Sequence, residues 1–217
     1  MEKLLCPSMM CADYSNLKSE VISLENSGID IFHLDVMDGH FVPNFGMGLQ
    51  DIEYICSVAT KPCDVHLMVT NPAEYIEKFA QIGCSIIYIH PETDIHPCRT
   101  LQKIHDLGVK AGIALNPGTT YETVEPLLYL SDYVMLMSVN PGFAGQKYID
   151  FVTDKFTKFV KEAPVHGGYK VMIDGACSPE RISELSREGV SGFVLGTSAL
   201  FGKDRSYNEI IPELRAL

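Results

Sequence analysis

The sequence predicts an α/β fold in which eight strand–helix pairs close into a single (β/α)8 barrel. Short apolar runs alternate with helical patterns along all 217 residues. The pairs recur about every twenty to forty residues, which suits one strand, one helix and two loops. Because no long linker interrupts them, residues 1–217 are expected to form one domain.

Eight segments have the composition of buried strands, with apolar residues bounded by turn-forming residues. In chain order they are Leu4–Ser8, Asp30–Met37, Pro62–Val69, Ser85–His90, Lys110–Leu115, Tyr133–Val139, Lys170–Asp174 and Gly192–Leu195. The spacing leaves room for a helical crossover between consecutive strands, and crossovers of this kind join parallel strands.

The helices between these strands carry start and stop signals. Ser178 and Pro179 offer an N-cap followed by proline at the first helical position, and Gly189 ends that helix. Asn71 and Pro72 repeat the pattern. The expected helices are Asp13–Gly28, Leu49–Val58, Asn71–Gly83, Arg99–Leu107, Thr120–Leu130, Phe151–Val160, Ser178–Gly189 and Tyr207–Leu214. A doubly wound open sheet is the alternative, which a G-x-G-x-x-G turn after the first strand would favour; Pro7–Met10 is not one.

Composition limits the partners. A net charge of −11 argues against nucleic acid and anionic membranes. No run approaches the roughly 18 apolar residues of a membrane span, and the first ten residues lack a signal-peptide core. The seven cysteines form no C-x-x-C pair and are expected to be reduced thiols in the cytoplasm. A cytoplasmic enzyme and a small-molecule binding protein both fit.

Polar side chains gather where the predicted strands end, the face on which barrels build their sites. Alternation puts His33, Asp35 and Met37 on one face of the second strand, although unpaired polar groups are costly to bury. The third strand places His66 and Met68 on one face, and the seventh ends at Asp174.

Two imidazoles and two carboxylates suggest a metal site. His33, Asp35, His66 and Asp174 offer the nitrogen and oxygen ligands that suit zinc, iron(II), manganese or cobalt. Any one buried histidine is more often a hydrogen-bonded core residue. Four such groups at one barrel mouth favour the metal hypothesis.

Asp35 and Asp174 also suit acid–base chemistry. Their strands are three steps apart around an eight-stranded barrel, so the carboxylates face each other across part of the mouth. One could remove a proton from carbon while the other delivers one to the opposite face. A bound metal would stabilise the enediolate oxygens formed in between. The alternative is that both are ligands only.

Glycine-rich loops follow three late strands. Gly142, Phe143, Ala144 and Gly145 lie after the sixth strand, Gly175 and Ala176 after the seventh, and Gly196, Thr197 and Ser198 after the eighth. Backbone amides in such loops commonly hold phosphate in barrels. Lys147 is the only cation near these loops. One such loop alone would be interpreted as an ordinary turn.

The remaining polar and methionine residues have less specific interpretations. Met37, Met68 and Met137 would form an apolar, water-poor floor, or simply fill the core. Glu92 is a partner for a metal histidine or a structural ion pair, and Asp38 is a structural hydrogen-bonding residue. Residues 38–48 form a candidate lid. No role is assigned to His40, His96, His105 or His166.

With these residues collected, the chain resembles the ribulose-phosphate 3-epimerase family over essentially its whole length. The resemblance rests on His33–Asn44, Asp64–Met68, Met137–Gln146 and Ile173–Gly175, together with Pro7–Ser8 and Gly196–Ser198. It implies a TIM barrel of the ribulose-phosphate-binding type with one divalent metal per active site, zinc being favoured. It also implies a sugar phosphate as partner, and a homo-oligomer, either dimer or hexamer.

Carried onto this sequence, the resemblance makes His33, Asp35, His66 and Asp174 the metal ligands and Asp35 and Asp174 the acid–base pair that inverts carbon 3. Ser8 and His66 would contact the sugar. The phosphate would be surrounded by Gly142–Gly145, Gly175, Ala176, Gly196, Thr197 and Ser198.

Departures from the family pattern leave the substrate open. Ala176 stands where the pentose enzymes usually have a second glycine, and His90–Thr93 and Ala144 are similar to the D-allulose 6-phosphate 3-epimerase branch, whereas Asn140 fits the pentose branch. The expected reaction is D-ribulose 5-phosphate to D-xylulose 5-phosphate. The alternative is D-allulose 6-phosphate to D-fructose 6-phosphate.

Two more distant functions fit the sequence less well. The related decarboxylase group needs an Asp-x-Lys-x-x-Asp motif, and Met37 occupies the lysine position. A non-enzymatic sugar-phosphate binder would be expected to lack a catalytic carboxylate, and both are present.

Overall fold

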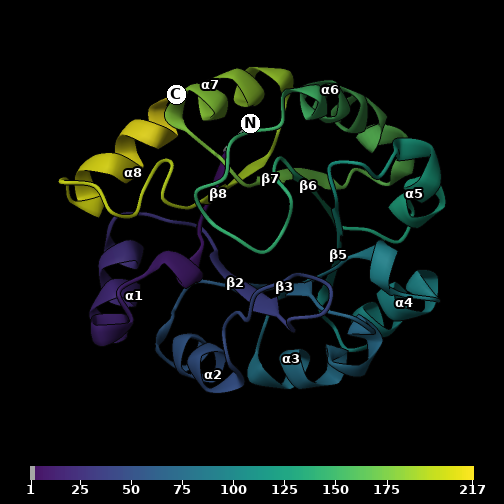
Figure 1. Ribbon diagram of the computed structural model, residues 1–217, viewed down its shortest axis with the longest axis horizontal. Helices are drawn as coiled ribbons and strands as arrows, with labels where there is room; N and C mark the ends of the chain where they lie inside the picture. Colours follow the sequence, from purple (N-terminus) through teal and green to yellow (C-terminus); the bar gives the residue numbers. More distant parts are fainter. Residues whose placement is uncertain (1–2) are drawn as a thin grey trace.

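Eight parallel strands form a barrel inside a ring of helices in the computed structural model, which describes residues 3–217 (Figure 1). The strands are β1 (Leu4–Pro7), β2 (Phe32–Met37), β3 (Cys63–Met68), β4 (Ile86–Ile89), β5 (Lys110–Leu115), β6 (Tyr133–Met137), β7 (Lys170–Asp174) and β8 (Gly192–Leu195). They pair in the order β1-β8-β7-β6-β5-β4-β3-β2. A bridge between Ser8 and His33 joins the two end strands and brings the barrel close to closure.

The helices alternate with the strands, as predicted. They are α1 (Leu17–Asn26), α2 (Leu49–Val58), α3 (Ile76–Ile82), α4 (Pro97–Asp106), α5 (Tyr121–Leu128), α6 (Thr153–Glu162), α7 (Pro179–Glu188) and α8 (Tyr207–Ala216). Short 3-10 turns extend several ends: η1 (Met9–Cys11), η2 (Tyr14–Asn16), η3 (Pro72–Glu74), η4 (Pro91–Thr93), η5 (Asp150–Val152) and η6 (Ala163–His166). None of the helices in residues 3–217 has the length and apolar character needed to cross a membrane.

One of the two predicted proline-containing caps is confirmed. The Ser178 hydroxyl accepts a hydrogen bond from the Arg181 amide at 3.4 Å, and Gly189 ends α7 in the left-handed conformation. Asn71 behaves differently from the prediction. It has a φ of 53° and its side chain caps nothing, because the chain first makes the 3-10 turn η3 before α3 begins.

Strand alternation divides the interior into two layers. Side chains such as Phe32, Leu34 and Val65 point outward and pack against the helices in the larger core. The inner layer, inside the barrel, contains Tyr88 and Met135 with smaller residues around them. A buried strand therefore has one wholly apolar face toward the helices, and its other face can carry polar groups toward the mouth.

Two loops meet at the mouth of the barrel. The loop between β2 and α2 is tied down at its start by Asp38, whose carboxylate accepts hydrogen bonds from the amides of His40, Phe41 and Thr70 and from the Thr70 hydroxyl, at 2.7–2.9 Å. The loop after β6 crosses the mouth in the view of Figure 1. Asp38 thus has the structural hydrogen-bonding role expected of it.

Candidate active site

The four predicted metal ligands lie together at the mouth. His33 and Asp35 come from β2, His66 from β3 and Asp174 from the end of β7. One potential ligand atom from each lies within 4.8 Å of those of the other three, so the group could hold a divalent metal ion. The inward face of each strand brings them together, although β2 and β7 are far apart in the sequence.

Asp35 is the buried centre of this group. Its Oδ2 accepts a hydrogen bond from the Ser8 hydroxyl at 2.6 Å, while its Oδ1 lies 3.2 Å from His33 Nε2 and 3.2 Å from His66 Nδ1. Burial by itself would raise the pKa of Asp35, but the two histidines outweigh it and hold that pKa far below its usual range. Asp35 is therefore ionised at neutral pH.

His33 is oriented from behind by Asp64. Its Nδ1 lies 2.6 Å from Asp64 Oδ1, and both side chains are fully buried. Burial opposes charge on His33, but the carboxylates of Asp64 and Asp35 raise its pKa well above the usual value. Asp64 is itself raised in pKa by burial. The Nε2 atom of His33 lies 3.2 Å from Asp35 Oδ1 but makes no hydrogen bond with any of the described residues.

His66 is linked to a second histidine. Its Nδ1 lies 3.2 Å from Asp35 Oδ1 and 3.5 Å from Asp174 Oδ2, while its Nε2 lies 2.8 Å from Nε2 of His90. His90 Nδ1 in turn lies 3.4 Å from Glu92 Oε2. Burial lowers the pKa of His90 to about 4. Partial burial would raise the pKa of Glu92, but the nearby His90 and the hydrogen bonds from Thr119 and Asn116 lower it to about 2.

The donor set fits a divalent cation. The carboxylates of Asp35, Asp64 and Asp174 lie around the imidazoles of His33 and His66. His33 Nε2 is buried without a hydrogen bond, which costs free energy unless another group binds it. A cation would accept the lone pairs of both histidines and offset the carboxylate charges. His33, Asp35, His66 and Asp174 are the residues that would hold it.

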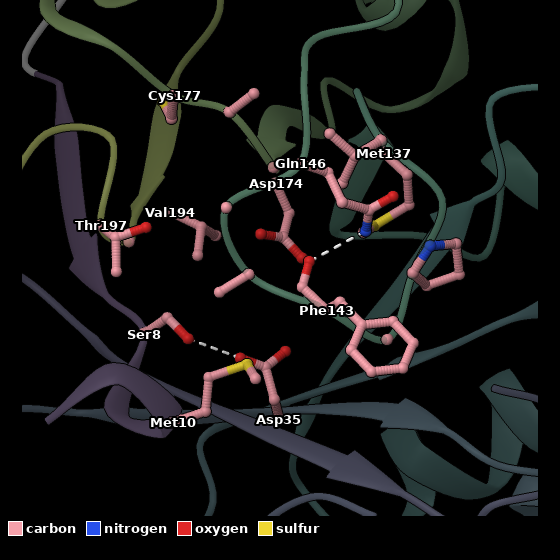
Figure 2. Close-up of a pocket in the computed structure, with 18 of the residues that line it drawn as sticks. Ser8, Met10, Asp35, Met137, Phe143, Gln146, Asp174, Cys177, Val194 and Thr197 are labelled. Carbon is pink, nitrogen blue, oxygen red and sulfur yellow. Dashed lines mark hydrogen bonds between the residues drawn. The ribbon is translucent and has the colours of Figure 1, made fainter. Parts of the chain in front are cut away.

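A pocket lies directly above this group (Figure 2). Ser8, Asp35 and Asp174 are on its floor and wall, and Phe143 and Gln146 of the β6–α6 loop cover one side. Most predicted contact residues line it, namely Ser8, Met68, Met137, Gly142, Phe143, Ala144, Gly145, Gly175, Ala176, Gly196, Thr197 and Ser198. Met10, Cys11, Val139, Asn140, Pro141, Gln146, Cys177 and Val194 line it as well and were not predicted.

The late-strand loops present backbone to this pocket. Gly175 has a φ of 98°, and a side chain there would bring its Cβ to 2.5 Å from Val139 Cγ2. Ala176 follows with a φ of 42°, one of only two positive values outside glycine in the described chain. None of the residues lining the pocket within residues 3–217 is lysine or arginine. Any anion there must be held chiefly by amides and hydroxyls.

Three predicted features lie outside the pocket lining, namely His66, Met37 and residues 38–48. Met37 does not line the pocket; it packs with Val42 and Met68, and its methyl group lies where a Cβ of Gly46 would be. The β2–α2 loop covers Met37, and the alternation of side chains along β2 does not predict the path of that loop. Residues 38–48, the candidate lid, contribute nothing to the pocket lining. The covering segment is the β6–α6 loop, against which the β2–α2 loop rests.

Asp64 and His90 are the polar neighbours of the ligands that were not assigned a role from the sequence. Asp64 lies two residues before His66, so the same alternation that selected His66 places it on the inner face. His90 follows β4 directly. Its contact with His66 depends on how neighbouring strands are staggered, for which the sequence has no signal.

Comparison with known sequences identifies a family. The sequence model described as "Ribulose-phosphate 3 epimerase family" matches residues 4–201. The ribulose-phosphate 3-epimerase of Aquifex aeolicus is 41% identical over 204 residues, which cover 93% of this chain and 91% of that protein. The Bacillus subtilis ribulose-phosphate 3-epimerase is 38% identical over 213 residues, covering 97% of each chain.

Comparison with solved structures confirms the fold. KGPDC from Streptococcus mutans superposes with a TM-score of 0.76 at 12% identity, covering 100% of this chain and 97% of that one. The 3-keto-L-gulonate-6-phosphate decarboxylase of Vibrio cholerae gives 0.71 at 15% identity, covering 100% and 97%. At these identities the likeness is one of architecture alone.

Proposed function

The chain belongs to the ribulose-phosphate 3-epimerase family and is therefore an isomerase; from this premise we propose that it is a metal-dependent enzyme that inverts carbon 3 of D-ribulose 5-phosphate to give D-xylulose 5-phosphate. The observation that carries the proposal is the placement of Asp35 and Asp174 in one pocket, on strands from different sides of the barrel, around one group of possible metal ligands.

Inversion needs two proton carriers on opposite faces of one carbon. In the proposed mechanism, one of the two carboxylates removes the proton from carbon 3 and the other returns a proton from the other side. Ser8 fixes the orientation of Asp35 through the 2.6 Å hydrogen bond to Oδ2. Asp174 is more exposed, with 16% of its side chain accessible against 4% for Asp35, so it can move more freely toward the substrate.

A divalent metal held by His33, Asp35, His66 and Asp174 would supply positive charge for the substrate oxygens at carbons 2 and 3, which become negative when the proton leaves. Among the four metals that these ligands suit, we favour zinc. The apolar side chains of Met68 and Met137 line the same pocket and keep it poor in water, which strengthens these interactions.

The substrate phosphate would lie against the loops after β6, β7 and β8. Their amides, with the hydroxyls of Thr197 and Ser198, are the available donors. Binding mainly by fixed dipoles explains how a chain with a net charge of −11 could hold an anion.

Location and assembly complete the proposal. We expect a cytoplasmic enzyme, which is supported by seven cysteines that are all unpaired. We expect a homo-oligomer, a dimer or a hexamer, on the basis of membership of the family.

The test is solvent-deuterium exchange at carbon 3 by Asp35→Asn and Asp174→Asn, measured from each epimer. Each variant should interconvert the epimers about 10²–10⁴-fold more slowly. Each variant should exchange the carbon 3 hydrogen of at most one epimer, namely the epimer whose hydrogen points toward the carboxylate that remains. The bound metal is quantified in parallel, because both residues are also proposed ligands.

The exposed Asp204→Asn is the matched control and should behave as the native enzyme. Native interconversion rates in either active-site variant would refute the two-carboxylate mechanism. The same assay with D-allulose 6-phosphate tests the alternative substrate, which Ala176 favours. Faster turnover of that sugar would move the assignment to the hexulose branch.

A further inference from the structure

A chain of polar groups extends from the inner surface of the barrel mouth to its rim. It runs from His66 through His90 to Glu92, with contacts of 2.8 Å between the two Nε2 atoms and 3.4 Å between His90 Nδ1 and Glu92 Oε2. Both histidines are fully buried, whereas 22% of the Glu92 side chain is exposed. The proposed proton transfer uses neither His90 nor Glu92.

The contact between the two rings fixes where the protons lie. His66 Nδ1 faces Asp35 and Asp174, so it is the atom that would bind a metal through its lone pair. A neutral imidazole then carries its proton on Nε2. That proton would be donated to His90 Nε2, which would then be unprotonated. The proton of His90 would be on Nδ1, which lies 3.4 Å from Glu92 Oε2 without making a hydrogen bond in this structure.

Glu92 is held in place beside His90. Its Oε1 accepts hydrogen bonds from the Asn116 amide at 2.9 Å and from the Thr119 hydroxyl at 2.5 Å, which leaves Oε2 for His90. Above the histidine, the ring of Phe41 lies 4.7 Å from that of His90, centroid to centroid. His90 therefore has His66 on one side and the fixed carboxylate of Glu92 on the other.

We propose that His90 and Glu92 are positioning residues that hold His66 in the tautomer and orientation needed to bind the metal. The inference rests on the metal site of the proposed function. The arrangement around His66 parallels that around His33. His33 contacts the carboxylate of Asp64 directly, whereas His66 is connected to the carboxylate of Glu92 through the imidazole of His90. Partners of this kind typically change metal affinity by 10–100-fold.

The test compares two substitutions of His90 in metal-free protein titrated with Co²⁺. In His90→Gln, the side-chain oxygen can still accept the His66 proton. In His90→Phe, the ring volume and the contact with Phe41 remain but the acceptor is lost. The proposal predicts that His90→Phe binds Co²⁺ about 10–100-fold more weakly than the native protein and has an altered visible Co²⁺ spectrum. His90→Gln should keep much more of the native Co²⁺ affinity.

A purely structural role for the ring predicts the reverse order. Thermal unfolding of the metal-free proteins shows whether each variant is folded. Glu92→Gln, at a partly exposed position, should weaken Co²⁺ binding by several-fold and decides the question if neither His90 variant folds. His105→Gln, which removes a histidine 2.9 Å from Asp132 far from the site, is the control.

Three results would overturn the proposal. They are Co²⁺ binding by His90→Phe as tight as that by His90→Gln, an unchanged Co²⁺ affinity in folded Glu92→Gln, and the absence of stoichiometric Co²⁺ binding by the native protein. Because the readout is metal affinity and a spectrum, the result is independent of whether the protein epimerises a sugar phosphate.

Discussion

At the scale of single residues, the candidate site shows how position decides the chemistry of a side chain. Asp35, Asp64 and Asp174 are chemically identical, yet one is ionised between two histidines, one is buried behind His33 and one is partly exposed in the pocket. Burial and the nearest charged groups account for the difference. The conformation of the backbone at a single residue also affects stability, as the positive φ of Ala176 illustrates.

Ala176→Gly should be neutral or stabilising. Alanine at a φ of 42° is strained by about 1 kcal/mol, which glycine relieves, although glycine also gains entropy in the unfolded chain. Urea unfolding at neutral pH measures the change, expected between about 0 and 1 kcal/mol of added stability. Ala80→Gly within α3 is the control and should lose about 1 kcal/mol. An equal loss at both positions would contradict the strain argument.

At the scale of elements, the β2–α2 and β6–α6 loops work as a pair. Asn44 Nδ2 donates a hydrogen bond of 2.7 Å to Gly142 O, and Asn44 O accepts one from the Gly39 amide at 3.0 Å. Val42 is buried against Gly142, which has a φ of 116° and where an added Cβ would come within 3.0 Å of Val42 Cβ. The first loop therefore supports the loop that covers the pocket.

Asn44→Ala should weaken substrate binding more than it slows the chemical step. Losing one hydrogen bond of about 1 kcal/mol to the covering loop should raise KM by about fivefold, with a smaller change in kcat. Steady-state kinetics with ribulose 5-phosphate measures both. Asn208→Ala, on the exposed side of α8, is the control. A fall in kcat with unchanged KM would show that the loop contact acts in another way.

At the scale of the whole molecule, the barrel brings distant strands to one point. The proposed ligands come from β2, β3 and β7, so metal binding would hold together different parts of the barrel wall. The apolar core formed between strands and helices surrounds this centre on the outside. Metal occupancy should therefore be visible in global stability.

Removal of divalent metal with a chelator should lower the melting temperature. A metal at 100 times its Kd adds about 2.7 kcal/mol to the folded state, which corresponds to roughly 5–11 °C for a chain of this size. Differential scanning calorimetry with and without added Zn²⁺ measures the shift. Asp174→Asn should show a smaller shift, and an equal one would place the stabilising metal elsewhere.

The strand–helix alternation and the inner face of each strand could be predicted from the sequence alone. Periodicity of two puts His33 with Asp35, and Asp64 with His66, on the inner side, because side-chain direction is a local property of the backbone. Strand and helix positions followed from the same local signals, with small errors at their ends. The chemical types at the strand ends were enough to predict one shared site.

Contacts between distant side chains could not be predicted from the sequence, because they depend on how the barrel packs. The contact of His66 with His90 depends on the stagger of β3 against β4, and the hydrogen bond from Asn44 to Gly142 joins residues 98 positions apart. Met37 was predicted in the pocket but lies beneath the β2–α2 loop, because loop paths are set by packing rather than by local pattern. Local sequence thus fixes the direction of a side chain, whereas its partners are fixed by how the whole barrel closes.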